Sequence, residues 1–383
     1  MITHNLGFPR VGKKRELKFA LEAFWQGRSN EAALLSTAES LQIEHWHAQQ
    51  ENGIDLLPVG DFALYDHVLN TTLLLGLSPE RVAHAKSALE KEFLIARGQA
   101  DHQCNGCSAS DMTKWFDTNY HYIVPELSAD SRTQVNAKPL LDQIALAKEN
   151  NNNESKPVLV GPVTYLYLSD YQGDNKLDLL DELIYGYQQL INTLESADAN
   201  WLQIDEPILA LELSKEWQEA LVKAYQVLQW GKVKPLLTTY FGDISHHIDI
   251  IKQCNVAGIH LDIVAEKVNA QDLIKQLPSD WVISLGVVDG RNVWKSDLVT
   301  IYQQLLPIYR EIEERLWLAP SCSLLHSPID LSLEKKLSQE VKSWLAFGIQ
   351  KCNELALLKS ALITQSTEAI TEYSAPVLAK LVS

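Results

Sequence analysis

The chain has 383 residues, a mass of 43.1 kDa and a formal net charge of −16. A hydrophobic fraction of 46% with a charged fraction of 21% is typical of a globular protein and excludes a mainly disordered chain. The negative charge disfavours a general affinity for nucleic acid or an anionic membrane, because the field of the whole molecule repels both. An anionic ligand would therefore need a local basic patch.

The sequence lacks the marks of membrane insertion or secretion. No run approaches the ~18–20 consecutive apolar residues that span a bilayer. Residues 1–10 do not show a basic region followed by an apolar one, as a signal peptide would. The five scattered cysteines indicate reduced thiols rather than a disulfide framework. We therefore expect a cytoplasmic protein that does not enter a membrane.

Short apolar runs that end in small or polar residues recur along the chain, as in strands buried on both faces of a parallel sheet. They cover residues 6–11, 54–62, 157–165, 201–207, 233–241, 258–264, 281–290 and 316–324. Segments with helical spacing follow the later runs, at 177–194, 215–228, 244–254 and 298–315. This alternation predicts an α/β fold, a (β/α)₈ TIM barrel. The alternative is a doubly wound open sheet, but no G-x-G-x-x-G follows the first run.

Two long insertions, predicted to be mainly helical, interrupt the first half of the barrel at about 13–50 and 66–155. The polar run 149–155 is predicted to be an exposed loop.

The carboxyl ends of the predicted strands should meet at one mouth, where such barrels carry their active sites. The residues expected there are Arg10, Asp61, Thr164, Asp205, Glu206, Tyr240, Asp262, Asp289, Arg291, Cys322 and Ser323. Adjacent carboxylates on a strand point to opposite faces, so Asp205 and Glu206 cannot form one acid–base pair. Asp205 either accepts a hydrogen bond from a ligand amine or caps the next helix.

Residues 1–18 contain five Lys and Arg residues and one Glu, a local charge of +4. If a helix begins near residue 13, Arg15 and Lys18 share a face, as do Lys14 and Lys18. The pattern fits either a solvated helix face or a clamp for phosphates or several carboxylates. A second candidate cation is Lys114 in the aromatic stretch 111–122, which either binds a ligand or lies over an apolar surface.

Candidate metal ligands are few and do not converge. Zinc needs three or four Cys, His or carboxylate ligands. Cys104 and Cys107 have C-x-x-C spacing without a second pair nearby, and Cys322 with His326 lacks a third ligand. His45 and His47 face apart in a helical context. We predict no metal site in this chain.

Seven segments, in chain order, resemble cobalamin-independent methionine synthase over residues 1 to about 376. They are LGFPRVG at 6–12, RELK at 15–18, DLLPVGDF at 55–62, MTKWF at 112–116, VGPVT at 160–164, QIDEP at 203–207 and SCSLLHSP at 321–328.

The resemblance implies two facing (β/α)₈ barrels that transfer a methyl group from 5-methyltetrahydropteroyltri-L-glutamate to homocysteine in methionine biosynthesis, without cobalamin. This sequence resembles only the N-terminal barrel, with 1–376 as a single domain and 377–383 as the start of the linker. The family's zinc ligands, homocysteine pocket and catalytic histidine belong to the second barrel. We therefore expect a methyltransferase by family, with no catalytic residue and no zinc in this chain. Its partner would be the C-terminal catalytic barrel, in cis or in trans.

The resemblance also implies that the glutamate tail of the folate binds Arg15, Glu16, Leu17, Lys18 and Lys114. A tail of several carboxylates needs local cations in an acidic protein, which agrees with the charge pattern. Asp205, Tyr240, Asp262 and Cys322 would form a vestigial mouth, because one thiolate and one carboxylate cannot complete a zinc shell. The alternatives are a stand-alone folate-polyglutamate-binding protein, a subunit of a split synthase, or a carboxylate-dependent hydrolase using Glu206 and Asp262.

Overall fold

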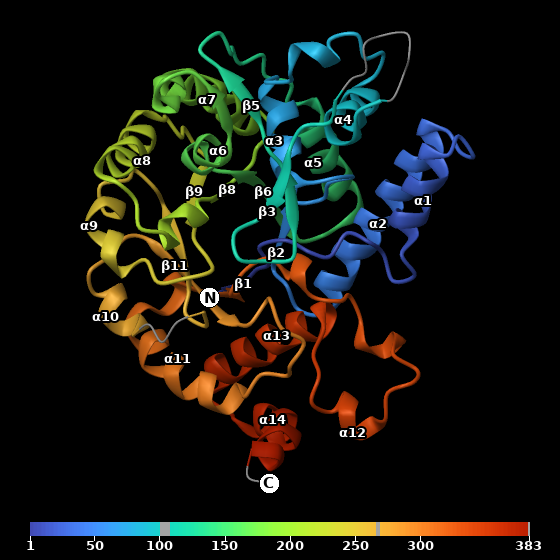
Figure 1. Cartoon of the computed structure of the whole chain (residues 1–383). Helices are drawn as coiled ribbons and strands as arrows, with labels where there is room; N and C mark the ends of the chain where they lie inside the picture. The colour runs from blue at the N-terminus through green and yellow to red at the C-terminus, as the bar shows by residue number, and fades with distance from the viewer. Residues whose placement is uncertain (100–107, 266–268, 382–383) are drawn as a thin grey trace.

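The computed structural model describes residues 1–99, 108–265 and 269–381, and eight parallel strands form its central sheet (Figure 1). The strands are β1 (Ile2–Thr3), β2 (Leu56–Val59), β6 (Glu154–Val160), β8 (Trp201–Asp205), β9 (Lys234–Thr238), β10 (Gly258–Asp262), β11 (Val282–Val288) and β12 (Leu316–Pro320). From β2 to β12, each strand of this sheet pairs with the next strand of the same sheet in chain order. Strand β1 pairs with β12. A parallel bridge between His4 and Leu56 brings β1 beside β2. The predicted (β/α)₈ barrel is confirmed.

Helices surround the sheet, so its strands are buried on both faces and appear in the sequence as continuous apolar runs. They are α1 (Glu16–Trp25), α2 (Glu31–Glu51), α3 (His67–Leu75), α4 (Ala88–Arg97), α5 (Lys138–Asn150), α6 (Pro162–Leu168), α7 (Leu180–Ser196), α8 (Lys215–Val227), α9 (Ile248–Ile251), α10 (Ala270–Ile274), α11 (Leu298–Ile312), α12 (Gln339–Lys342), α13 (Gly348–Thr364) and α14 (Glu368–Leu381). Within the described ranges, no helix is both long and apolar enough to cross a bilayer.

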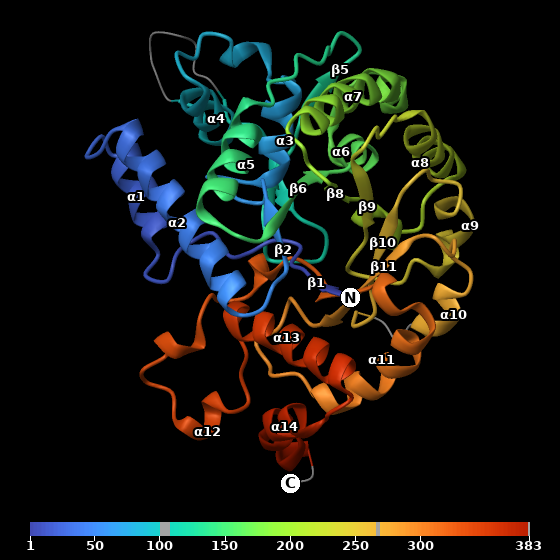
Figure 2. The same cartoon turned by 180° about the vertical axis from the view of Figure 1, so that it is seen from behind.

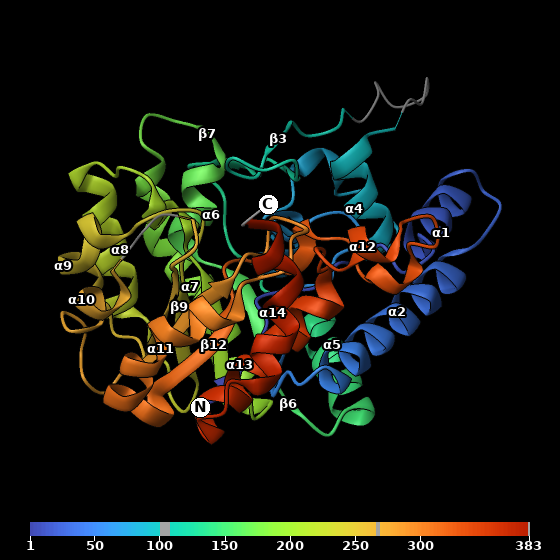
Figure 3. The same ribbon diagram turned by 90° about the horizontal axis from the view of Figure 1, so that it is seen from below.

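The first predicted insertion is mainly helical, but the second is not, since its α-helices cover only residues 67–75, 88–97 and 138–150 of its described part. The first forms α1 and α2, which pack on each other and project at the edge of the molecule (Figure 2). The second contains α3, α4 and α5, together with an unpredicted antiparallel hairpin of β3 (Met112–Lys114) and β4 (His121–Ile123). A further small sheet joins β5 (Glu126–Ser128) to β7 (Asp170–Gln172). At the other end of the chain, α13 and α14 pack beside α11 (Figure 3).

The first strand was predicted at residues 6–11, but it lies at Ile2–Thr3. Residues 6–10 of this run are buried by loop packing rather than by sheet pairing, whereas Val11 is exposed. The backbone groups of the run bind outside the sheet: Phe8 N donates to Asp61 Oδ2 at 2.9 Å, and Gly7 O accepts from Leu324 N at 2.9 Å.

The predicted loop at 149–155 is also wrong at both ends. Helix α5 continues to Asn150 and strand β6 begins at Glu154. Only residues 151–153 connect them, and Asn153 Nδ2 donates to Ile54 O at 2.6 Å.

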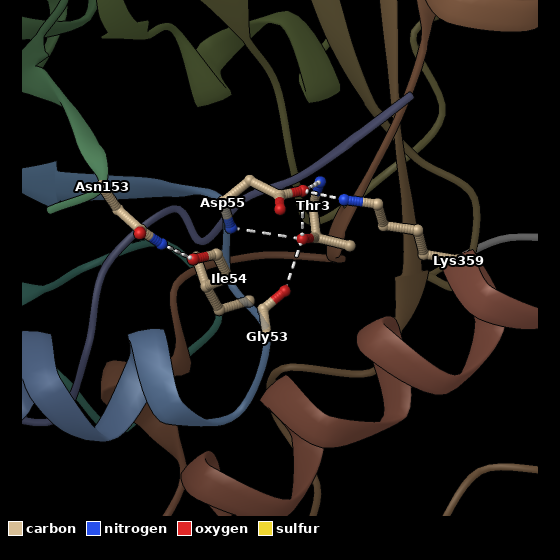
Figure 4. A network of polar contacts seen from close by, with 6 residues as sticks. All are labelled: Thr3, Gly53, Ile54, Asp55, Asn153 and Lys359. Atoms are coloured by element: carbon tan, nitrogen blue, oxygen red, sulfur yellow. Dashed lines mark hydrogen bonds and ion pairs between the residues drawn. The ribbon is translucent and has the colours of Figure 1, made fainter.

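A polar network fastens β1 to the start of β2 (Figure 4). Asp55 Oδ2 accepts from Thr3 N at 2.7 Å and from Lys359 Nζ at 2.6 Å, which ties both segments to α13. The hydroxyl of Thr3 lies 2.6 Å from Gly53 O. Burial alone would raise the pKa of Asp55, but the bonds from Lys359 and Thr3 outweigh it and hold the pKa below its usual value. We call this junction the barrel seam.

Candidate functional site

A small cavity, lined by both polar and apolar residues, lies at the carboxyl ends of the strands, which form the barrel mouth. Its volume is about 40 Å³, which admits a few water molecules but not a folate. Two buried nitrogens of its lining residues, Arg10 Nε and His67 Nδ1, have no hydrogen-bond partner among the described residues. The structure brings together at this cavity several of the residues predicted there, namely Arg10, Asp61, Asp205, Tyr240 and Ser323.

Asp205 is held by side chains inside the barrel. Its Oδ1 accepts from Gln203 Nε2 at 2.8 Å and its Oδ2 from the Tyr240 hydroxyl at 3.1 Å. Behind it, Lys156 Nζ donates to Gln203 Oε1 and, at 2.9 Å, to Asn5 O. Burial raises the pKa of Asp205 to about 7 and lowers that of Lys156 to about 7. Of the two alternatives predicted for Asp205, the helix cap is therefore wrong. The other, a hydrogen bond to a ligand amine, stays a prediction.

Glu206 points away from the mouth, so the two adjacent carboxylates face opposite sides of the chain as predicted. One oxygen of Glu206 accepts from Thr164 N at 2.7 Å and from the Thr164 hydroxyl at 2.5 Å. The other accepts from the Tyr225 hydroxyl at 3.0 Å and from Val163 N at 3.2 Å. Burial raises the pKa of Glu206 to about 7. Thr164 was predicted at the mouth, but it lies within α6 and binds this carboxylate.

Asp262 and Cys322, the other members of the predicted vestigial mouth, have structural roles. Asp262 Oδ1 accepts from Val264 N at 3.0 Å and Ala265 N at 2.9 Å, and Oδ2 accepts from Phe241 N at 3.0 Å. The Cys322 side chain is fully buried, and burial raises the pKa of its thiol. With Asp262 bound in this way and Glu206 facing elsewhere, the hydrolase alternative lacks its pair of carboxylates.

The chemistry of the donor set does not suit zinc. In the part of the chain that the structure describes, no three His, Cys, Asp or Glu side chains converge to hold a metal ion. Burial lowers the pKa of His45 to about 4, whereas His47 is exposed and contacts Asn150 O at 2.8 Å. These two histidines face apart, as predicted. Cys104 and Cys107 lie outside the described residues.

Residues 112–123, which we call the aromatic hairpin, cover the barrel mouth. The ring of Trp115 lies 4.4 Å from that of His67, and the ring of Tyr120 lies 6.3 Å from that of His326. The guanidinium of Arg291 donates to a backbone carbonyl in the hairpin tip. Because these rings and bonds fill the opening, only the small cavity remains beneath them.

Residues 10–18, which we call the basic turn, leave the barrel and enter α1. The helix begins at Glu16, not near residue 13 as predicted. Gly12 has φ 81° and Arg15 has φ 64°, and Lys14 N donates to Glu16 Oε2 at 2.8 Å. Arg15 and Lys14 therefore precede the helix, and the prediction that each shares a helical face with Lys18 is wrong. A left-handed residue at position 15 has no sequence signal, because such positions favour glycine.

The residues that the resemblance assigns to the folate tail lie in both of these segments. Arg15, Lys18 and Lys114 are exposed, whereas Leu17 is buried and could offer a ligand only its backbone. Lys18 lies 3.8 Å from Glu22. Neither Arg15 nor Lys114 forms an ion pair with another described residue.

Arg10 joins the basic turn to the aromatic hairpin. Its Nη1 donates to the Tyr120 hydroxyl at 2.6 Å, and its guanidinium carbon lies 5.5 Å from the centre of that ring. Sequence reasoning did not single out Tyr120. The only signal was the dense aromatic content of residues 111–122, which does not show that the stretch folds over the mouth.

Known proteins with this architecture include a B12-independent methionine synthase from Shewanella sp. W3-18-1. It superposes with a TM-score of 0.66 at 14% identity, covering 95% of this chain and 98% of that one. A methyltransferase from Methanosarcina mazei gives a TM-score of 0.55 at 9% identity, covering 94% of each chain. At such identities the likeness concerns the fold alone.

Relatives at the sequence level include curated proteins named 5-methyltetrahydropteroyltriglutamate–homocysteine methyltransferase. The protein of Vibrio cholerae is 48% identical over 385 residues, covering 99% of this chain and 50% of the relative. The protein of Proteus mirabilis is 49% identical over 381 residues, which cover 98% of this chain and 50% of the relative. The chain thus spans about half the length of these curated relatives. Residues 2–313 match the model of the cobalamin-independent synthase N-terminal domain, and the chain therefore belongs to that family.

Proposed function

We propose that this chain is the N-terminal barrel of a cobalamin-independent methionine synthase. It binds the glutamate tail of 5-methyltetrahydropteroyltri-L-glutamate, and the methyl group is then transferred to homocysteine. The names of the relatives support this activity and substrate, since they match this chain along almost its whole length.

The observation that carries the proposal is the set of exposed cations at the start of α1 in a molecule of net charge −16. The N-terminus of a helix attracts anions through its free N–H groups and its dipole. Arg15 stands at this point in a left-handed conformation, which costs about 1–2 kcal/mol in a residue with a side chain. Such strain is concentrated at ligand-binding and active sites. Lys114 supplies a further cation, from the aromatic hairpin.

The chain contributes positioning rather than chemistry. Holding the tail at a fixed place lets the reactive end of the folate reach its partner without a further search. Because the described residues provide no group that could hold zinc, we assign the zinc to the C-terminal barrel, in cis or in trans. This barrel alone is then expected to show no methyl transfer, and no cobalamin is required.

Calorimetry with the mono- and triglutamate forms of the folate tests the tail site. An exposed ion pair is worth roughly 0.5–1 kcal/mol, so Lys114→Ala should weaken triglutamate binding about two- to fivefold. Added salt should weaken it too. The matched control is Lys232→Ala, which removes an exposed lysine just before β9, at the opposite end of the barrel. Equal affinity for both folates, insensitive to salt, would contradict the proposal.

Activity tests the partner barrel. The chain alone should give no methionine from the triglutamate folate and homocysteine, and adding the C-terminal half of a relative should restore turnover. If the tail binds but no such addition restores turnover, the chain is a stand-alone folate-polyglutamate-binding protein. Turnover by the chain alone, free of metal, would contradict the proposal that this barrel binds the tail while the C-terminal barrel holds the zinc.

A further inference from the structure

The basic turn is a rigid unit from residue 10 to the first turn of α1. Arg15 N donates to Gly12 O at 3.2 Å, and Leu17 N donates to Val11 O at 3.2 Å. A methyl group at Gly12 would lie 2.2 Å from the carboxylate of Glu16, so this turn is tightly packed. The position of Arg10 therefore fixes the position of Arg15.

The aromatic hairpin is a second rigid unit. In its ladder Lys114 pairs with His121. Its tip is closed by Trp115 N, which donates to Tyr120 O at 2.8 Å, and by the Thr118 hydroxyl, which donates to Trp115 O at 2.6 Å. The position of Tyr120 therefore fixes the place where the Lys114 side chain leaves the hairpin.

A partly buried hydrogen bond joins the two units. Arg10 is 8% exposed, and its Nη1 donates to the Tyr120 hydroxyl at 2.6 Å. The hydroxyl in turn donates to Tyr65 O at 3.3 Å, so its proton is used elsewhere and its oxygen is free to accept from Arg10. The charge of the donor strengthens this contact. The opposite end of the hairpin is held independently, by Ile123 N donating to Asp66 Oδ2 at 3.0 Å.

We propose that Arg10 and Tyr120 are positioning residues that fix the spacing between the cations of the basic turn and Lys114. This spacing selects folates whose tail is long enough to reach both groups. The inference rests on the proposed function, because it concerns how the same tail is read. Two groups that bind one ligand gain affinity only while their separation matches the span of that ligand. A single glutamate reaches one group and gains nothing from the spacing.

Tyr120→Phe tests this in the whole chain, because it removes the hydroxyl and keeps the ring against His326. We expect the ratio of triglutamate to monoglutamate affinity to fall, by no more than the roughly two- to fivefold expected for Lys114→Ala, because misplacing a cation cannot cost more than removing it. Monoglutamate affinity should stay unchanged. The control is Tyr122→Phe in the same hairpin, whose hydroxyl donates to Leu168 O at 3.2 Å, away from the basic turn. It should leave the ratio unchanged.

Arg10→Lys provides a second route if Tyr120→Phe unfolds, which thermal melting would show. It keeps the positive charge but removes the planar donor, and the ratio should again fall. The effect of Lys114→Ala should also be smaller in a Tyr120→Phe background, since the two residues act together. If Lys114→Ala lowers the ratio and Tyr120→Phe does not, this inference is refuted and the proposed function stands. If Lys114→Ala has no effect in the wild-type background, the proposed function itself fails.

Discussion

The barrel seam should be sensitive to a single substitution. Strand β1 has two residues, and beside β2 it has one parallel bridge and the bond from Asp55 N to Thr3 O at 3.0 Å. Asp55→Ala removes the acceptor of Thr3 N, a hydrogen bond to a charged group worth about 1.5–3 kcal/mol. It also removes the ion pair with Lys359. In this pair the side chain of Lys359 is 25% exposed and that of Asp55 is 38% exposed. Screening by solvent limits that pair to roughly 0.5–1 kcal/mol.

Together these losses predict that Asp55→Ala lowers the free energy of unfolding by about 2–4 kcal/mol, whereas Lys359→Met lowers it by about 0.5–1 kcal/mol. Urea denaturation measures both changes. Hydrogen exchange should become faster at Thr3 and His4. Asp280→Ala is the control, because this exposed aspartate precedes β11 at the same end of the barrel and should change stability little. A loss below about 0.5 kcal/mol for Asp55→Ala, with exchange unchanged, would refute the reasoning.

The same carboxylate predicts a dependence on pH. The pKa of Asp55 is lower in the folded protein than in the unfolded chain. Its contribution is therefore present above the unfolded value of about 3.9 and is lost as the pH falls through the folded value. The difference in stability between the wild type and Asp55→Ala should narrow in acid. A difference that stays constant from pH 7 to pH 3 would contradict this account.

Other substitutions test the site and the core. Glu206→Ala leaves buried donors without an acceptor and should cost about 3 kcal/mol or more of unfolding free energy by urea denaturation. Burial raises the pKa of Glu206 to about 7, so the folded state favours the neutral carboxyl group. The free energy of unfolding of the wild type should therefore fall, relative to that of Glu206→Gln, as the pH rises through 7. Gly12→Ala should weaken triglutamate binding, since its new methyl group would meet Glu16 at 2.2 Å. Gly27→Ala, also at positive φ but with nothing within 4 Å, should leave calorimetric affinity unchanged.

The sequence predicted the barrel because most of its strands lie between a packed interior and a layer of helices. Such strands appear as unbroken apolar runs. The first strand escaped prediction, since two residues give no pattern. Meanwhile the run 6–11 is apolar for another reason: Leu6 and Phe8 are buried by loops.

The site was less predictable. The local charge of the basic turn was visible in the composition, but the start of α1 depends on a left-handed Arg15 that no propensity favours. The role of Tyr120 depends on a contact with Arg10 across 110 positions of the chain. Asp205 was predicted from its strand end, but its partners Gln203 and Tyr240 are set by which side chains point into the barrel.

The barrel seam has a consequence for how the protein is made. Lys359 reaches Asp55 across 304 positions of the chain, and His4 N donates to Leu318 O. During synthesis the first strand must therefore wait, without its partners, until the chain has been made as far as β12 and Lys359. Contacts between such distant segments form slowly, and an unpaired strand is exposed to aggregation in the meantime. Closure of the sheet by β1 is then a late event in the folding of this barrel.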